Sequence, residues 1–323
     1  MIKFKLKNDK YEIEIPALAF GTASFEKQNN DEEYFPFLDM YVNLGGNCID
    51  TARSYCSWIE NGESSAETTI GRWFKARNNR EDIILVTKGG HDGWIEGERV
   101  PRLNREELEG DLNKSLEVLQ TDYIDLYLLH RDDESTPVEE IMPILNDFVK
   151  SGKVHFIGAS NWKTERIEKA NEFAIKNGME PFRVSQIYYS LAHTSKEAIG
   201  DPTIACMDTK AYAWYKKNNF PVMAFSPQAK GFFSKVASGE SITHHMESQF
   251  VSTANLARLS RVKTMCEETG YSPATLVLGY LNSQQFPVCS VFSATKLWQL
   301  EEDMQAGDIV LDEKQLAFLE NRM

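Results

Sequence analysis

The chain carries an aspartate, a tyrosine, a lysine and a histidine whose types and spacing suit proton transfer. Asp50 ends a short apolar run, Tyr55 follows it closely, and Lys88 and His130 each lie at the end of a later run. A free tyrosine has a pKa of about 10, which is too high for easy proton donation near neutrality. A neighbouring ammonium stabilises the phenolate and lowers that pKa, and a carboxylate holds the ammonium in place. The four types predict a general-acid device, in which the histidine orients the substrate oxygen.

Taken one at a time, each of these residues also has a plainer interpretation. Lys88 precedes two glycines and can be a loop cation. His130 can be a buried histidine with a satisfied hydrogen bond, and Tyr55 can simply pack beside Cys56 and Trp58. The joint arrangement at the ends of three apolar runs favours the catalytic interpretation.

Eight short apolar runs must position these residues. Most runs are continuous rather than alternating, as expected for strands that are buried on both faces. The runs are residues 17–20, 47–50, 83–87, 124–129, 154–159, 184–188, 222–225 and 288–292. Amphipathic stretches separate them, so the order predicts eight strand–helix units in a closed (β/α)8 TIM barrel. The carboxyl ends of the strands then share one mouth, where Asp50, Lys88 and His130 would point.

Helix and turn signals complete this architecture. Residues 106–120 repeat leucine with helical spacing, residues 138–150 follow Pro137 at a helix start, and residues 164–177 end at Gly178. At the N-terminus, residues 2–15 alternate around Asn8-Asp9-Lys10, which predicts a hairpin that closes the bottom of the barrel. The longest irregular stretches, 89–104, 191–204 and 228–253, follow the third, sixth and seventh strands, where barrel enzymes keep substrate and cofactor loops.

Over nearly its whole length the sequence resembles the aldo-keto reductase family. The matching motifs are Asp-Thr-Ala-x-x-Tyr at 50–55, Thr-Lys at 87–88 and Leu-His at 129–130. Gly-Arg-Trp-Phe-Lys, Leu-His-Arg-Asp-Asp and Ala-Ser-Asn-Trp are similar to a bacterial branch described only as oxidoreductases. The resemblance implies hydride transfer between a nicotinamide cofactor and a carbonyl or alcohol. It implies Tyr55 as the proton donor, Lys88 and Asp50 as its activating pair, and His130 as the substrate-orienting residue.

The nicotinamide end of a cofactor site follows from the same resemblance. Ser160, Asn161 and Gln186 would hold the carboxamide, and their uncharged donors and acceptors suit an amide. The plainer interpretation of Ser160 or Asn161 is a cap on the following helix. The segment Phe225-Ser-Pro-Gln-Ala-Lys-Gly resembles the family's Tyr-Ser-Pro-Leu-x-x-Gly, which implies that Phe225 stacks on the nicotinamide ring.

The resemblance places the pyrophosphate against Ser226, Gln228 and Lys230, although a polar turn with a solvated lysine is the alternative. The adenosine would face four residues of the last segment, namely Ser293, Gln299, Glu302 and Asp303. Glycines and one threonine complete the expected cofactor set, namely Gly21, Thr22 and Gly231.

Two residues of the adenosine segment depart from the family. Ser293 stands where glycine or lysine is usual, and Asp303 stands where asparagine is common. A carboxylate near a 2′-phosphate requires an offsetting cation, and Lys296 at the start of the predicted helix supplies one. We therefore expect NADP, with NAD possible as the alternative. There is no G-x-G-x-x-G after a strand, which counts against a Rossmann unit.

The substrate loops mix aromatic, acidic and amide side chains. Trp58, Trp94 and Arg131 are the candidate substrate residues, and such a mouth suits a sugar or polyol. Solvated loop side chains are the plainer interpretation. Two other functions stay open: a cofactor-binding regulatory subunit of the same fold, and a metal-dependent barrel hydrolase or lyase. The latter needs convergent ligands, yet of the histidines only His130 ends a strand.

Composition limits the number of domains, the classes of partner and the cellular compartment that we expect. The 323 residues are 42% hydrophobic and 26% charged, which suits a single barrel domain over 1–323. A net charge of −13 disfavours nucleic acid and anionic membranes as partners, but does not exclude a small anionic cofactor. The expected partner, a small carbonyl or sugar-like substrate, is what the family resemblance implies. Five widely spaced cysteines, without a C-x-x-C pair, predict free thiols and a cytoplasmic protein. No apolar run is long enough to span a membrane, and the oligomeric state is open.

Overall fold

Parallel strands close into a barrel in the computed structural model, which describes residues 1–26, 30–60 and 62–320. The order around the barrel is β10-β11-β12-β3-β4-β5-β8-β9, so the expected fold is confirmed. Each strand coincides with one of the predicted apolar runs to within two residues. The barrel strands are β3 (Leu18–Gly21), β4 (Cys48–Asp50), β5 (Ile84–Gly89), β8 (Ile124–Leu129), β9 (Val154–Ser160), β10 (Ser185–Tyr188), β11 (Val222–Phe225) and β12 (Val288–Phe292).

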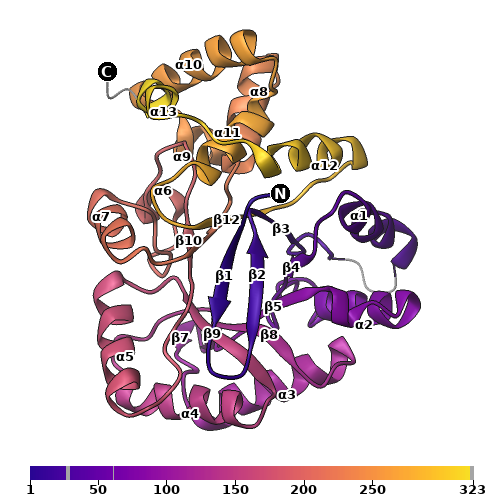
Figure 1. The fold of residues 1–323 in the computed structure, drawn as a ribbon, viewed down its shortest axis with the longest axis vertical. Helices are drawn as coiled ribbons and strands as arrows, with labels where there is room; N and C mark the ends of the chain where they lie inside the picture. The colour runs from indigo at the N-terminus through magenta and orange to yellow at the C-terminus, as the bar shows by residue number, and fades with distance from the viewer. Residues whose placement is uncertain (27–29, 61, 321–323) are drawn as a thin grey trace.

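Helices surround the barrel and bury the outward faces of its strands (Figure 1). The helices of the described part of the chain, including short ones in the loops, are α1 (Asp31–Asn43), α2 (Ser65–Arg77), α3 (Arg105–Leu119), α4 (Val138–Lys150), α5 (Thr164–Lys176), α6 (Lys196–Ile199), α7 (Thr209–Asn218), α8 (Phe232–Ser238), α9 (His244–Phe250), α10 (Thr253–Thr269), α11 (Pro273–Asn282), α12 (Leu297–Met304) and α13 (Glu313–Glu320). Three 3-10 turns are η1 (Arg80–Asp82), η2 (Ala229–Gly231) and η3 (Gln305–Asp308). None of these described helices is long and apolar enough to cross a bilayer.

The predicted helix boundaries hold with one adjustment. Helices α3, α4 and α5 occupy the expected segments, and Gly178 after α5 takes the left-handed conformation that glycine favours. Pro137 is the residue immediately before α4, where its extended backbone precedes the helix, rather than a member of the first turn.

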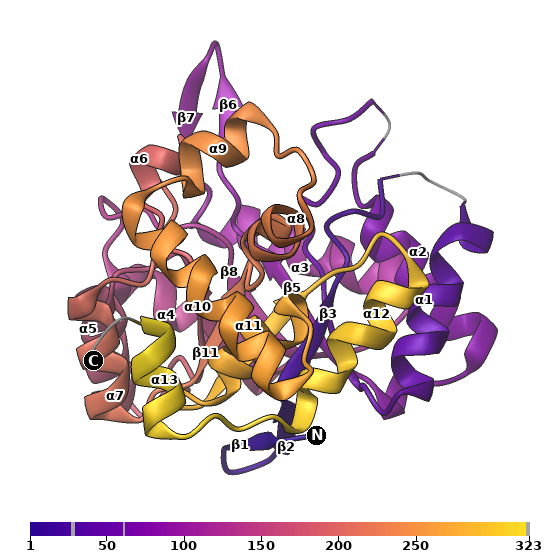
Figure 2. The same ribbon diagram turned by 90° about the horizontal axis from the view of Figure 1, so that it is seen from above.

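An N-terminal hairpin closes the end of the barrel opposite the mouth, as expected. Strands β1 (Lys3–Lys7) and β2 (Glu12–Pro16) pair antiparallel, and the Asn8 side chain holds the turn by accepting from the amides of Lys10 and Tyr11. Leu6 and Ile15 pack with the side chains inside the barrel. Figure 2 shows this hairpin at the bottom of the molecule.

The three stretches expected to be irregular contain short elements of their own. The first holds a hairpin of β6 (Gly93–Ile95) and β7 (Glu98–Val100), whose turn residues Glu96 and Gly97 both have positive φ. The second contains α6, and the third contains η2, α8 and α9. Figure 2 shows the β6–β7 hairpin, α8 and α9 at the end of the molecule opposite the β1–β2 hairpin. The insertions therefore gather at the mouth of the barrel.

Candidate active site

A buried lysine joins two of the other predicted catalytic residues at the mouth. Lys88, at the end of β5, donates from Nζ to Asp50 Oδ2 at 2.7 Å, to Tyr55 Oη at 2.9 Å and to the carbonyl of Thr51 at 2.8 Å. Parallel pairing places Asp50 of β4 beside Val86 of β5, so the lysine lies two residues further toward the mouth. The three donors of an ammonium are thereby all used.

Protonation in this cluster follows from burial. Burial raises the pKa of Tyr55 well above its ordinary value, Asp50 adds to the rise, and Arg131 opposes it. This direction is opposite to the lowering by Lys88 that the sequence suggests, because burial is the largest effect on the Tyr55 pKa and the Asp50 carboxylate adds to it. Burial also lowers the pKa of Lys88, against the pull of Asp50. Tyr55 therefore holds its proton at neutral pH.

His130 lies beside the tyrosine as a neutral imidazole. Burial lowers its pKa well below the ordinary value, and the charges of Arg131, His91 and Lys88 lower it further. The Tyr55 and His130 rings lie edge to face with centroids 5.8 Å apart. Nδ1 of His130 is 3.1 Å from Ser54 Oγ, so one ring nitrogen is engaged by the protein and Nε2 remains to bind an oxygen.

Asp50 also receives contacts from cofactor candidates. Gln186 donates from Nε2 to Asp50 Oδ1 at 2.7 Å, which leaves its amide oxygen as an acceptor. Thr22 donates from its hydroxyl to the backbone carbonyl of Asp50 at 3.1 Å and is fully buried. Thr22 thus supports β4 and does not line the cavity described next.

A cavity of about 630 Å³ opens over these residues. Its walls include Asp50, Tyr55 and His130, while Lys88 lies behind them. Every expected cofactor residue except Thr22 also lines it, namely Gly21, Ser160, Asn161, Gln186, Phe225, Ser226, Gln228, Lys230, Gly231, Ser293, Lys296, Gln299, Glu302 and Asp303. The fold therefore brings the predicted catalytic and cofactor residues to one cavity.

The plainer interpretation of Ser160 and Asn161 does not hold. The residue that caps α5 is Lys163, and neither Ser160 nor Asn161 occupies that position. Asn161 instead has a left-handed backbone, donates to the carbonyl of His130 at 3.2 Å and accepts from the amide of Ala205 at 3.2 Å. It ties the loops after three strands together at the cavity wall.

The loop after β11 has a constrained backbone. Ser226, Ala229, Lys230 and Gly231 all have positive φ, which is costly for the first three. Phe225 lies at the cavity wall and packs edge to face on Tyr188, with ring centroids 5.3 Å apart. Strained non-glycine residues gather at functional sites, where the surrounding fold holds them.

The far end of the cavity belongs to α12. Lys296 is the residue before the helix, as the sequence predicts, and the structure shows that it is exposed. Gln299 accepts from the amides of Thr295 and Lys296, so its side chain caps the helix in this structure. Asp303 accepts from Gln228 Nε2 at 2.6 Å, and burial raises its pKa to about 7.

Of the three expected substrate residues, one lines the cavity and two lie outside it. Arg131 lines the cavity and its side chain is 13% exposed. Trp58 and Trp94 are 61% and 70% exposed and do not line it; Trp94 belongs to β6 of the hairpin that follows β5, and Trp58 to the loop that follows β4.

Sequence reasoning also missed several cavity residues. Lys235 and Ser234 of α8 contribute a cation and a hydroxyl, and Trp298 of α12 contributes an aromatic face. No sequence signal distinguishes Lys235 from other lysines, because the position of α8 over the cavity is a tertiary feature. In the described ranges, no three His, Cys, Asp or Glu side chains gather in a way that could hold a metal ion.

Comparisons with known proteins identify the family and the fold of the chain. A model of the Aldo/keto reductase family matches residues 17–321. The solved structure of a thermostable aldo-keto reductase, Tm1743, in complex with the inhibitor epalrestat has the same fold, with a TM-score of 0.73 and 24% identity. The superposition covers 99% of each chain.

The relatives with curated descriptions are named for several different substrates. The L-glyceraldehyde 3-phosphate reductase of Escherichia coli is 27% identical, over 96% of this chain and 90% of its own. A Saccharomyces cerevisiae protein described as a putative aryl-alcohol dehydrogenase, AAD14, is 26% identical over 96% and 83%. Norsolorinic acid reductase B of Aspergillus parasiticus is 35% identical, over 59% of this chain and only 50% of its own length. By the family match over residues 17–321, the chain belongs to the aldo/keto reductase family.

Proposed function

We propose that the protein is an NAD(P)-dependent oxidoreductase that interconverts a carbonyl and an alcohol, with Tyr55 as the proton donor. The observation that carries this proposal is the contact of Lys88 Nζ with both Asp50 Oδ2 and Tyr55 Oη at the wall of a cavity. A buried ammonium fixed by a carboxylate holds the phenol in one position and stabilises the phenolate that forms when the proton leaves.

A nicotinamide cofactor, when bound, supplies the hydride that adds to the carbonyl carbon. Tyr55 donates its proton to the oxygen, and Lys88 balances the negative charge that remains on the phenolate. His130 is neutral, and in the tautomer in which Nδ1 accepts from Ser54 Oγ its Nε2 carries the proton and donates to the carbonyl oxygen. The reverse sequence oxidises the alcohol.

The donor set at the cavity fits such a cofactor. Ser160, Asn161 and Gln186 present uncharged groups at the catalytic end, and Phe225 offers an aromatic face. At the opposite end Lys230, Lys235 and Lys296 provide positive charge for phosphate groups. This supports NADP as the preferred cofactor, with Lys296 at the 2′-phosphate.

The substrate class is a polar carbonyl compound. Polar side chains surround the catalytic tyrosine, and the relatives include proteins named for a sugar phosphate and for aryl alcohols. Trp58 and Trp94, the aromatic residues expected to stack on a sugar ring, lie outside the cavity. We therefore keep a sugar or polyol as one member of the class rather than its definition.

A substrate screen tests the proposal directly. Purified protein is assayed with NADPH and NADH on aldehydes and ketones, and with both oxidised cofactors on the matching alcohols. We expect turnover of polar aldehydes that is lost in Tyr55→Phe. Cofactor binding without turnover of any compound would contradict the proposal and favour the cofactor-binding regulatory subunit.

A further inference from the structure

We propose that Arg131 binds an oxyanion of the substrate, so that the preferred carbonyl compounds carry a carboxylate or phosphate group. This inference rests on the proposed function and narrows its substrate class. Arg131 directly follows His130 at the end of β8, lines the cavity, and acts electrostatically on Tyr55. A substrate whose carbonyl lies at Tyr55 thus has this cation near its other end.

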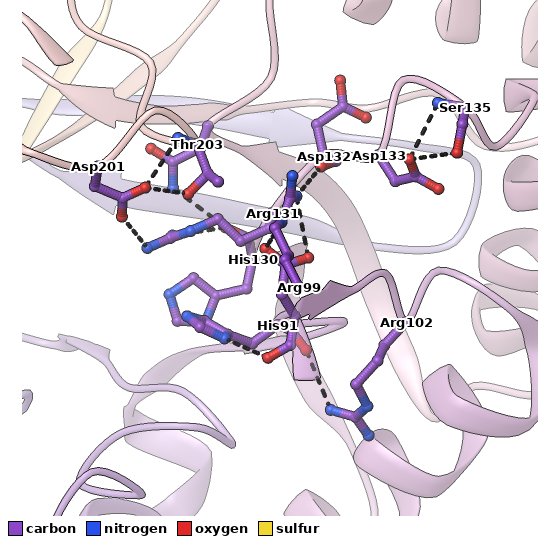
Figure 3. A network of polar contacts seen from close by, with 12 residues as sticks. His91, Arg99, Arg102, His130, Arg131, Asp132, Asp133, Ser135, Asp201 and Thr203 are labelled. Carbon is purple, nitrogen blue, oxygen red and sulfur yellow. Dashed lines mark hydrogen bonds and ion pairs between the residues drawn. The ribbon is translucent and has the colours of Figure 1, made fainter. Parts of the chain in front are cut away.

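The neighbouring arginines are all engaged by carboxylates of their own. Arg166 Nε is 2.7 Å from Asp132 Oδ1, and Arg102 Nη2 is 3.0 Å from Asp111 Oδ1. Arg99 binds Asp92 through two nitrogens. Figure 3 shows Arg99 and Arg102 in the network around His91 and His130. None of these three arginines lines the cavity.

Arg131 differs in its contacts. Its only carboxylate contact in the described part of the chain is Asp201 Oδ2 at a long 3.4 Å, and its other hydrogen bond is to the carbonyl of His130 at 3.1 Å. A guanidinium has five N–H donors, so three remain without a partner among the described residues. Burial lowers the pKa of Arg131, with Asp201 and Asp92 opposing that effect.

Asp201 is itself held elsewhere. Its Oδ1 accepts from the amide and the hydroxyl of Thr203, at 2.9 and 2.6 Å. The Arg131 side chain extends toward Asp201 across the loops that follow β8 and β10 (Figure 3). A cation that is largely buried, faces a cavity and has a weak carboxylate contact binds a planar or tetrahedral oxyanion through its free donors.

Matched substrate pairs test this assignment. One pair is 4-carboxybenzaldehyde and its methyl ester, and the other is glyceraldehyde 3-phosphate and glyceraldehyde. We expect kcat/KM to favour the charged member, mainly through KM. In Arg131→Met the ratio of charged to neutral substrate should fall by about tenfold or more, the cost of losing a hydrogen bond to a charged group. In Arg131→Lys it should fall less, because the charge remains.

Two further variants complete the design. Arg99→Met removes a paired arginine of the same network outside the cavity, and should leave the ratio unchanged. Asp201→Asn removes the competing carboxylate, and should tighten KM for the charged substrates several-fold. If Arg131→Met lowers the kcat/KM ratio only in the benzaldehyde pair, the oxyanion is a carboxylate. If it lowers the ratio only in the glyceraldehyde pair, the oxyanion is a phosphate. The inference is overturned if the ratio of kcat/KM for charged and neutral substrates is the same in the parent and in Arg131→Met for both pairs.

Binding without turnover separates this inference from the proposed function. If the parent turns over none of the four aldehydes and no compound of the wider screen, the proposed activity fails. Calorimetric binding of benzoate and of glycerol 3-phosphate, with and without NADP⁺, then decides the role of Arg131 alone. Binding that is lost in Arg131→Met supports the oxyanion site, whereas equal binding in both proteins, or none in the parent, contradicts it.

Discussion

The two ends of the cavity are organised in different ways. At the catalytic end, Lys88 and Asp50 are almost fully buried, and the lysine is joined to Asp50 and Tyr55 by direct hydrogen bonds. At the α12 end, Lys296 is exposed, and the buried Asp303 has a neutral partner, Gln228. Strand register holds the first group in place, whereas loops and a helix start position the second. Strands therefore hold the proposed catalytic group, whereas the charge proposed to select between NADP and NAD is an exposed lysine at the rim of the cavity.

The largest effect should come from the catalytic end. Tyr55→Phe removes the transferred proton, so we expect kcat to fall by about 10² or more while cofactor affinity stays nearly unchanged. Steady-state kinetics and cofactor titration on the same preparation measure both. Tyr271→Phe, at an exposed tyrosine, is the matched control. Parent-like turnover in Tyr55→Phe would remove the tyrosine from the mechanism.

Removing the lysine should have a somewhat smaller effect. Lys88→Met leaves the proton in place but takes away the cation that balances the phenolate, so activity should fall by about tenfold to 10². The alkaline limb in the pH dependence of kcat for carbonyl reduction, where Tyr55 loses its proton, should move to higher pH, because the phenolate loses its ammonium partner. The double variant Lys88→Met, Asp50→Asn keeps the test valid if an unpaired buried Asp50 prevents folding. An unchanged rate and pH profile in a folded variant would reduce Lys88 to a structural role.

A moderate effect is expected at the α12 end. If Lys296 pairs with a 2′-phosphate, Lys296→Ala should weaken NADPH binding by about tenfold, the lower part of the range for a charged hydrogen bond because the lysine is exposed. NADH lacks the phosphate and should bind as before. Isothermal titration of both cofactors against both proteins measures the difference. Equal weakening of both cofactors, or a parent that already prefers NADH, would instead assign Asp303 to a ribose hydroxyl.

The smallest effect is on stability. Burial raises the pKa of Asp303 to about 7, so between about pH 4 and pH 7 the folded state keeps a proton that the unfolded state has lost. The contribution of Asp303 to the free energy of unfolding therefore falls as pH rises from about 4 to about 7. Asp303→Asn should reduce the loss of Tm between pH 5 and pH 8. Glu67, whose pKa burial also raises to about 7, is present in both proteins, so their difference isolates Asp303. Identical pH slopes would mean that Asp303 ionises normally.

Much of the candidate site could be predicted, because the ends of the strands can be recognised in the sequence as the ends of apolar runs. Asp50, Lys88 and His130 each end an apolar run, and parallel pairing necessarily gathers such positions at one mouth. Arg131 follows from the same logic, since it is the next residue after His130. Trp58, Trp94 and Lys235 show where this reasoning stops, because their positions depend on how long loops and α8 fold over the barrel.

The apolar pattern along the chain is sufficient to predict the barrel, its strands and the residue types at their ends, because strands buried on both faces leave a continuous apolar run. The direction of the Tyr55 pKa could be obtained from the folded structure alone, since it depends first on burial and then on the neighbouring Asp50. The folded structure alone also showed that Arg131 has a weak carboxylate partner while Arg99, Arg102 and Arg166 have strong ones. Pairing between side chains on different loops has no periodicity, and therefore leaves no pattern along the chain.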